Sequence, residues 1–228
     1  MSRLTDHLDE LGIGIDPQLL ELALTHRSWA YENGRVPSNE RLEFLGDSVL
    51  GVIVTEHIFR VYSDRPEGQL AKLRAAVVSG AALARVAKSL EIGCCLKLGK
   101  GEIATHGDAK DSILADALEA IIGAIHLTGG FEASANFVHQ VMDLVIADAA
   151  DRGAGLDWKS SLQELTSLLG LGVPDYTCEY SGPDHERHFV AYVHIEGRDF
   201  GPGAASSRRA AEQNAAEIAY LALAPLSV

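Results

Sequence analysis

The stretch ERLEFLGDSVL, residues 40–50, carries acidic and apolar side chains on one predicted helix. Glu43 and Asp47 are i and i+4 neighbours, and Glu40 lies three residues before Glu43, so the three carboxylates share one stripe of that helix. The flanking positions are mostly Leu, Phe and Val, as in a helix that packs into a core. A core helix needs a physical reason for charge on the face that meets its neighbours.

A second pair of acids occurs in ILADALEAIIGAI, residues 113–125. Its only charged residues are Asp116 and Glu119, three positions apart, and the rest of the segment is apolar on nearly every side. This pattern also predicts a buried helix. Buried carboxylate pairs that stay ionised and unpaired are strongly destabilising, so both pairs require compensation.

Protonation, ion pairing or cation binding would each compensate these acids. Carboxylate oxygens are ligands that Mg²⁺ and Mn²⁺ prefer, and bound divalent ions can activate a water and stabilise a phosphodiester transition state. The competing interpretation is a set of structural ion pairs, with counterions among Arg41, Lys72, Arg74 and Lys110. A di-iron centre is disfavoured, because no Glu in the chain has a His three residues later.

Helical spacing of apolar residues recurs through most of the first 150 residues. The segments that show it are 19–30, 40–59, 68–90, 110–129 and 131–150. Glycine-containing breaks separate them at 32–39, 63–68, 91–108 and 128–132. Helix after helix without alternating strands predicts an all-α domain.

The pattern changes after the Ala/Gly/Asp-rich stretch DAADRGAGLD. We expect a first domain over 1–147, a linker over 148–156 and a second domain over 157–228. The second domain begins with a predicted helix and ends with another that starts near Ser206; between them are three strand-like runs, at 176–181, 188–196 and 198–203. The order α-β-β-β-α predicts a small α+β domain.

Bulk composition bears on partners and location. The net charge of −13 alone disfavours a nucleic-acid partner, although clustered Lys/Arg or bound divalent cations can reverse the local field. We find no signal peptide and no uninterrupted apolar segment long enough to span a membrane, so no membrane partner is expected. Three cysteines without a CxxC pair suit a reducing cytoplasm and give no zinc site.

NERLEFLGDSVL, residues 39–50, resembles the signature of the ribonuclease III family, and SILADALEAIIGAI, residues 112–125, resembles its second acidic helix. ALTHRSW (23–29) and PEGQLAKLRA (66–75) resemble two further family blocks in the family's order. The C-terminal part resembles the family's RNA-binding module. The resemblance therefore implies an all-α endonuclease domain followed by a small α+β (α-β-β-β-α) double-stranded RNA-binding domain.

The resemblance also implies roles for single residues. The metal-site ligands would be Glu43, Asp47, Asp116 and Glu119. Among them, Asp47 and Glu119 match the catalytic pair. Glu40 and Glu67 would engage RNA in the cleavage valley, and Phe44 would pack across the interface of a homodimer. Gln69 departs from the family, whose members often have Asp there, but that position is not among the metal-site acids.

The implied reaction is Mg²⁺-dependent cleavage of double-stranded RNA, with Mn²⁺ as a substitute ion. Its products would carry 5′ phosphates and short 3′ overhangs, and ribosomal precursors would be among the substrates. Two alternatives stay open from the residues alone: a protein that binds structured RNA without cutting it, and an unrelated helical phosphohydrolase. The four acids favour an enzyme over the first, and the RNA-binding module disfavours the second.

Three parts of the second domain are expected to contact RNA, by the same resemblance. The implied contacts are Ser160, Gln163 and Glu164 in the first helix, His185 in the first hairpin loop, and Ser207, Arg208 and Arg209 at the start of the last helix. A Ser cap, free backbone N–H groups and two arginines also predict a phosphate site without the family. From Asp157 onward five Lys/Arg face ten Asp/Glu, so we expect modest, salt-sensitive affinity.

Overall fold

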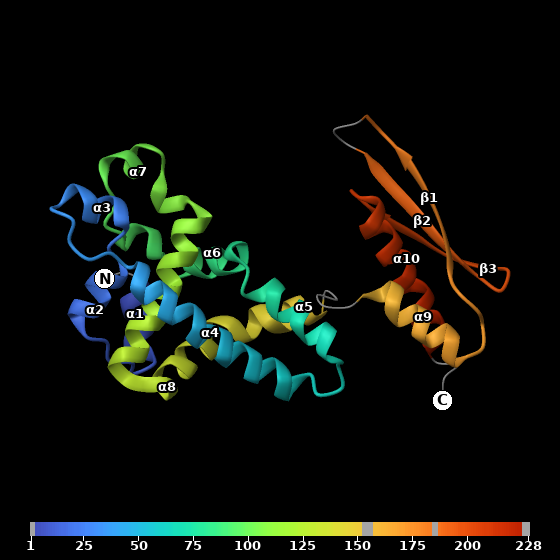
Figure 1. Cartoon of the computed structure of the whole chain (residues 1–228), viewed down its shortest axis with the longest axis horizontal. Coiled ribbons are helices and arrows are strands. Elements are labelled where there is room, and N and C mark those ends of the chain that lie inside the picture. The colour runs from blue at the N-terminus through green and yellow to red at the C-terminus, as the bar shows by residue number, and fades with distance from the viewer. Residues whose placement is uncertain (1–2, 152–156, 184–186, 225–228) are drawn as a thin grey trace. The chain divides into compact units, whose positions relative to one another are not determined.

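The computed structural model describes residues 3–151, 157–183 and 187–224, and the chain divides into two compact units, 1–155 and 156–228 (Figure 1). The last helix of the first unit continues to Asp151, so it includes the first four residues, 148–151, of the segment expected as a linker. Ala150 is buried against the helical core, which explains why helix persists there. The expected RNA contact His185 lies outside the described residues.

The described part of the first unit is built from helices. They are α1 (Arg3–Glu10), α2 (Pro17–Ala23), α3 (Arg27–Glu32), α4 (Glu40–Val61), α5 (Glu67–Val77), α6 (Gly80–Ser89), α7 (Lys100–Ala104) and α8 (Asp111–Asp151), with short 3₁₀ turns at Ile92–Cys95 and Gly107–Ala109. The all-α prediction is confirmed. Helix α8 is broken at Gly130, whose φ of 76° and ψ of −167° are not helical, at the position where the sequence predicts a break.

Two of the predicted helices are each divided in two. The segment 19–30 is interrupted before α3, because Thr25 pairs with Lys97 in an isolated bridge and the His26 side chain caps the new helix by accepting from Ser28 N. The segment 68–90 is interrupted at Ser79, whose side chain accepts from Ala82 N and starts α6. Helical periodicity continues across both breaks, so apolar spacing alone misses them.

Helices α4 and α8 pack together at the centre of the first unit (Figure 1). Leu50 and Val54 of α4 and Leu118 and Ile122 of α8 are fully buried in the same core. Each such side chain contributes about 1.5–3 kcal/mol relative to an exposed one. Among the described helices α8 alone is long and apolar enough to cross a membrane, but 61% of its apolar window is buried, as in the core helix of a folded domain.

The second unit has the predicted order α-β-β-β-α. It consists of α9 (Trp158–Leu168), β1 (Asp175–Ser181), β2 (His188–Ile195), β3 (Arg198–Ala205) and α10 (Arg208–Leu223). The strands form an antiparallel sheet in the order β1-β2-β3, and both helices cover one face of it (Figure 1). Leu162 of α9, Val193 of β2 and Ala216 of α10 are fully buried between the sheet and the helices.

Candidate metal centre and RNA-binding surface

Two glycines allow the backbones of α4 and α8 to approach closely. A Cβ atom at Gly46 would lie 1.7 Å from the carbonyl oxygen of Glu119, and one at Gly123 would lie 2.3 Å from the carbonyl oxygen of Leu42. No side chain fits at either position without moving a helix. Since Glu43 lies one turn before Gly46, and Glu119 one turn before Gly123, this close crossing brings the acids of the two helices together.

Three carboxylates meet at the crossing, and we call them the carboxylate cluster: Glu43 of α4 with Asp116 and Glu119 of α8. One oxygen from each lies within 4.8 Å of the others. All three side chains are partly buried. The structure thus brings together three of the four acids that the sequence predicts as metal ligands.

The electrostatics of the carboxylate cluster favour bound positive charge. Burial, together with the charges of Asp47 and Asp116, raises the pKa of Glu119 from 4.5 to about 7. Burial and the charge of Asp116 raise the pKa of Glu43. The pKa of Asp116 is raised by burial, against the opposing charges of His26 and Arg27. Each acid is therefore harder to ionise than in water, and a cation at the cluster would reverse these shifts.

A polar cavity of about 440 Å³ opens beside the cluster. Glu43 and Asp116 line it together with Glu40, which accepts a hydrogen bond of 2.7 Å from Ser38 Oγ. His26 and Arg27 complete the same wall, and burial lowers the pKa of His26. The structure therefore places both residues beside the acids.

Asp47, Glu67 and Phe44 lie apart from the carboxylate cluster within the chain. Asp47 is exposed on α4, one turn after Glu43, and acts on the cluster through its charge, which raises the pKa of Glu119. Glu67 begins α5 and lines a different cavity, of about 190 Å³, with Phe59. Phe44 is 79% exposed on α4. The fold of one chain does not bring these three residues into the carboxylate cluster, so their predicted roles stay predictions.

Sequence reasoning missed the two glycines, and the structure gives one candidate counterion a different partner. Gly46 and Gly123 interrupt otherwise good helix sequences. A mid-helix glycine costs about 1 kcal/mol relative to alanine, so its presence at these positions is the signal that could have revealed a close helix approach. Lys110 was one candidate counterion in the competing interpretation of the acids as structural ion pairs. In the structure its Nζ instead lies 2.6 Å from Glu102 Oε2, at the edge of the same cavity.

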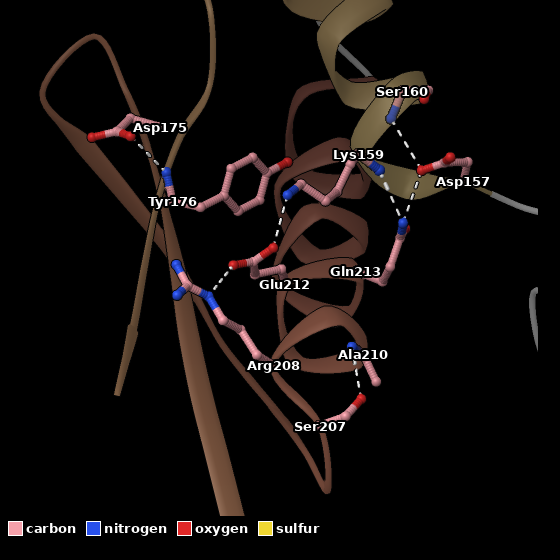
Figure 2. Close-up of polar contacts among 10 residues, drawn as sticks. All are labelled: Asp157, Lys159, Ser160, Asp175, Tyr176, Ser207, Arg208, Ala210, Glu212 and Gln213. Atoms are coloured by element: carbon pink, nitrogen blue, oxygen red, sulfur yellow. Dashed lines mark hydrogen bonds and ion pairs between the residues drawn. The ribbon is translucent and has the colours of Figure 1, made fainter. Parts of the chain in front are cut away.

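One face of α9 carries the three residues predicted to contact RNA there. Ser160, Gln163 and Glu164 are exposed and line a shallow hollow of about 620 Å³ with Ser167 and Leu168. Asp157 starts the helix by accepting from Ser160 N at 3.4 Å, and it also accepts from Gln213 Nε2 of α10 at 2.8 Å (Figure 2). The predicted face of α9 is thus held in position by the last helix.

The start of α10 has the features of a phosphate site. Ser207 Oγ accepts from Ala210 N at 3.3 Å, and Ser207, Arg208 and Arg209 are all exposed (Figure 2). The free N–H groups and positive end of the dipole favour an anion at this helix end. Since α10 has 16 residues, its dipole is well developed.

Glu212 connects this helix start to α9. Its side chain, 12% exposed, accepts from Lys159 Nζ at 2.8 Å and from Arg208 Nε at 2.9 Å (Figure 2). Burial alone would raise the pKa of Glu212, but the hydrogen bonds from Lys159 and Arg208 outweigh it and lower the pKa. The contact orients the Arg208 guanidinium and, through the hydrogen bond to Glu212, raises its pKa.

Comparison with known proteins gives the same division of the chain. Residues 16–144 match the Ribonuclease-III-like family, and residues 158–223 match the double-stranded RNA binding motif. Ribonuclease 3 of Thermobifida fusca is 55% identical over 215 residues, which cover 94% of this chain and 90% of that protein. Ribonuclease 3 of Mycobacterium tuberculosis is 49% identical over 219 residues, which cover 95% and 91% of the two chains.

Among solved structures, the first unit is similar to the nuclease domain of ribonuclease III from Campylobacter jejuni, described for structural flexibility in the region involved in dimer formation. The two share 40% sequence identity with a TM-score of 0.57, over 62% of this chain and 95% of that one. A crystal structure of the same nuclease domain gives 41% identity and a TM-score of 0.56.

Proposed function

Because the chain belongs to the ribonuclease III family and is an endoribonuclease with a double-stranded RNA-binding domain, we propose that it cleaves RNA duplexes at the carboxylate cluster with Mg²⁺. The observation that carries the proposal is the convergence of Glu43, Asp116 and Glu119 within 4.8 Å. The products would carry 5′ phosphates and short 3′ overhangs, and ribosomal precursors and other structured transcripts are the proposed substrates.

The donor atoms fit the proposed ion. The carboxylate cluster offers oxygen ligands only, in a partly desolvated site, which suits Mg²⁺ and also Mn²⁺. Glu43, Asp116 and Glu119 would hold the ion, with Asp47 one turn away on α4 as the fourth proposed ligand. When bound, Mg²⁺ supplies a water of lowered pKa and neutralises charge that develops on the leaving oxygen.

The residues around the cluster contribute charge, a proposed RNA contact and the spacing of the metal ligands. Asp47 and Glu119 are the proposed catalytic pair, and they are already coupled, since the charge of Asp47 raises the pKa of Glu119. Glu40 lines the cavity from the start of α4, where we propose that it engages the RNA strand. Gly46 and Gly123 set the spacing of the two helices and thereby the spacing of the ligands.

We further propose that two chains pair through α4. Phe44, Val52 and Phe59 are exposed on this helix at spacings of eight and seven residues, so they form one apolar stripe. Phe44 would pack in the homodimer interface. Glu67 lies in a cavity lined by Phe59, beside this stripe, so its proposed contact with RNA would be made in the dimer.

Duplex RNA would be held by the second unit. The proposed contacts are the exposed face of α9 (Ser160, Gln163 and Glu164), the loop residue His185, and the start of α10 (Ser207, Arg208 and Arg209). Helix α9 and the loop would follow successive minor grooves, while α10 would meet phosphates between them. We propose that the protein acts in the cytoplasm, where Cys94, Cys95 and Cys178 would remain free thiols, as they are in the structure.

A cleavage assay on a long RNA duplex tests the proposal. We expect cutting with Mg²⁺ and none after EDTA. Glu119→Gln should retain duplex binding in a filter assay and lose cleavage by about three orders of magnitude or more, because one ligand and one charge of the site are removed. Glu132→Gln, an exposed acid elsewhere on α8, is the matched control and should cut normally. Full activity of Glu119→Gln would disprove the site.

A further inference from the structure

A second group of metal-ligating side chains occurs on the same two helices, far from the carboxylate cluster. It consists of His57 of α4 with His139 and Asp143 of α8, and we call it the histidine–aspartate cluster. His57 follows Glu43 by fourteen residues, or about 21 Å along the helix. His139 and Asp143 lie on the part of α8 that follows the break at Gly130.

The three side chains converge on one point. Asp143 Oδ1 lies 2.9 Å from His139 Nδ1 and 3.5 Å from His57 Nδ1. One ligand atom from each of the three residues lies within 4.8 Å of the others, and the two imidazole rings are 5.2 Å apart between centroids. His139 and Asp143 share a face of α8 because they are four residues apart, so a single partner from α4 completes the group.

The histidine–aspartate cluster can be reached from solvent. His57 and His139 line a cavity of about 310 Å³, together with Ile53, Phe131 and Ala135. The side chain of His57 is only 18% exposed, while those of His139 and Asp143 are 41% and 44% exposed. His57 is thus held mostly in the packed interface of the helices, while His139 is more exposed in the same cavity, through which an ion can enter, and Asp143 is 44% exposed beside them.

We propose that His57, His139 and Asp143 bind a divalent transition-metal ion of the Zn²⁺ class. Two imidazole nitrogens and one carboxylate oxygen form the ligand set of open tetrahedral zinc sites, with water from the cavity in the remaining position. Ligands of tetrahedral Zn²⁺ are about 3.4 Å apart, given metal–ligand distances of about 2.0–2.1 Å. The observed separations of 2.9 and 3.5 Å lie on either side of that value.

This ligand set distinguishes the two clusters chemically. The carboxylate cluster offers hard oxygen atoms alone, whereas the histidine–aspartate cluster offers nitrogen as the majority donor. Mg²⁺ keeps its water shell and binds imidazole poorly, so millimolar Mg²⁺ should fill the first and leave the second to Zn²⁺. A bound ion would tie α4 to the half of α8 after Gly130, and would therefore stabilise the first unit.

Zinc titration of the full chain tests this inference. The chain is stripped with a chelator, returned to excess Mg²⁺, and titrated with Zn²⁺ against a chromophoric chelator. We expect one Zn²⁺ per chain, and at least tenfold weaker binding by His139→Ala and by Asp143→Asn. His188→Ala, which removes an exposed histidine of the second unit, is the matched control and should bind as the unmodified chain does.

A thermal readout separates lost ligation from lost structure. Zn²⁺ should raise the Tm of the unmodified chain and of His188→Ala in excess Mg²⁺, and should leave the Tm of His139→Ala unchanged. The side chains that both cluster variants replace are 41% and 44% exposed and lie outside the fully buried core, so their metal-free Tm should stay close to that of the unmodified chain. Equal zinc affinity in the unmodified chain and both cluster variants, or zinc that excess Mg²⁺ displaces completely, would overturn the inference.

Discussion

Glu119 is the acid of the carboxylate cluster whose pKa is raised far from its ordinary value. Burial is the main cause that raises its pKa to about 7, and the charges of the neighbouring acids add to the effect. A carboxyl whose pKa is higher in the folded state binds a proton more tightly there than in the unfolded chain. Its contribution to stability is therefore complete below the ordinary pKa of 4.5 and is lost as the pH rises through 7.

The first prediction follows from the raised pKa of Glu119. In EDTA, the free energy of unfolding should fall as the pH rises from 4.5 through 7, by at most about 3 kcal/mol from Glu119. Urea unfolding at a series of pH values measures it. Glu119→Gln cannot ionise and should flatten the profile, while Mg²⁺ should restore stability to the unmodified chain at high pH. Parallel profiles for the two proteins would contradict the assignment.

Tyr176 provides a second prediction at the scale of one residue. Within the described residues its hydroxyl oxygen is buried without a hydrogen-bond partner, and burial with the charges of Glu212 and Asp157 raises its pKa to about 12. The ring itself makes a cation–π contact, since Lys159 Nζ lies 4.2 Å from its centroid. Tyr176→Phe keeps the ring and removes the unsatisfied group.

We expect Tyr176→Phe to leave the stability of the second unit unchanged, or to raise its free energy of unfolding by about 1 kcal/mol and with it the Tm. Thermal unfolding of the full chain followed by circular dichroism measures this. Tyr192→Phe removes the hydroxyl of a more exposed tyrosine on β2 and should have no effect. A clear loss of stability in Tyr176→Phe would show that its hydroxyl has a partner in solution.

At the scale of the helices, the α4–α8 crossing determines whether the acids meet. Gly46→Ala would place a Cβ atom 1.7 Å from the Glu119 carbonyl oxygen, so the two helices must separate. Overpacking of this kind costs about 1–3 kcal/mol or more. We expect a lower Tm of the first unit and weaker Mg²⁺ activation of cleavage, because the ligands of the carboxylate cluster move apart.

Gly80→Ala is the control for that change. Gly80 opens α6, and a Cβ atom there would have nothing within 4 Å. Alanine is the better helix former by about 0.5–1 kcal/mol, so this variant should be equally or more stable and should cleave normally. Equal Mg²⁺ activation in Gly46→Ala and Gly80→Ala would show that the close approach is not needed for the site.

The same scale shows where sequence patterns succeed and fail. The acid pairs, the break at Gly130 and the α-β-β-β-α order are local patterns, and the structure has them as predicted. The divisions of 19–30 and 68–90 depend on a capping side chain and, at Thr25, on pairing with a residue 72 positions away. Apolar periodicity does not record such contacts, because both sides of the break still face the core.

At the scale of the whole molecule, a chain of net charge −13 must hold a polyanion. Cations at the acids would change the field where cleavage is proposed, and the exposed arginines of α10 lie in the unit that is proposed to bind RNA. Pairing of two chains through the apolar stripe of α4 would add a second site and a second RNA-binding unit. This assembly is open to direct measurement.

Phe44→Ser should shift the chain from dimer to monomer in sedimentation equilibrium, because the side chain is 79% exposed in the single chain and is proposed to be buried by the partner. Leu144→Ser is the matched control, since Leu144 is 83% exposed but lies on α8, outside the stripe. It should leave the dimer intact. If Phe44→Ser and the unmodified chain sediment alike, the proposed interface is wrong.

The amino-acid sequence by itself determined the helical class of the first unit, the α-β-β-β-α order of the second and the acid pairs on single helices. These follow from spacing along one element, which the 3.6-residue period fixes in a helix and the two-residue period fixes in a strand. Only the tertiary structure decided that Glu43 meets Asp116 and Glu119 while Asp47 stays exposed, and that His57 meets His139 and Asp143. Distances between helices depend on how closely their backbones pack, and here Gly46 and Gly123 set the closest approach of α4 and α8.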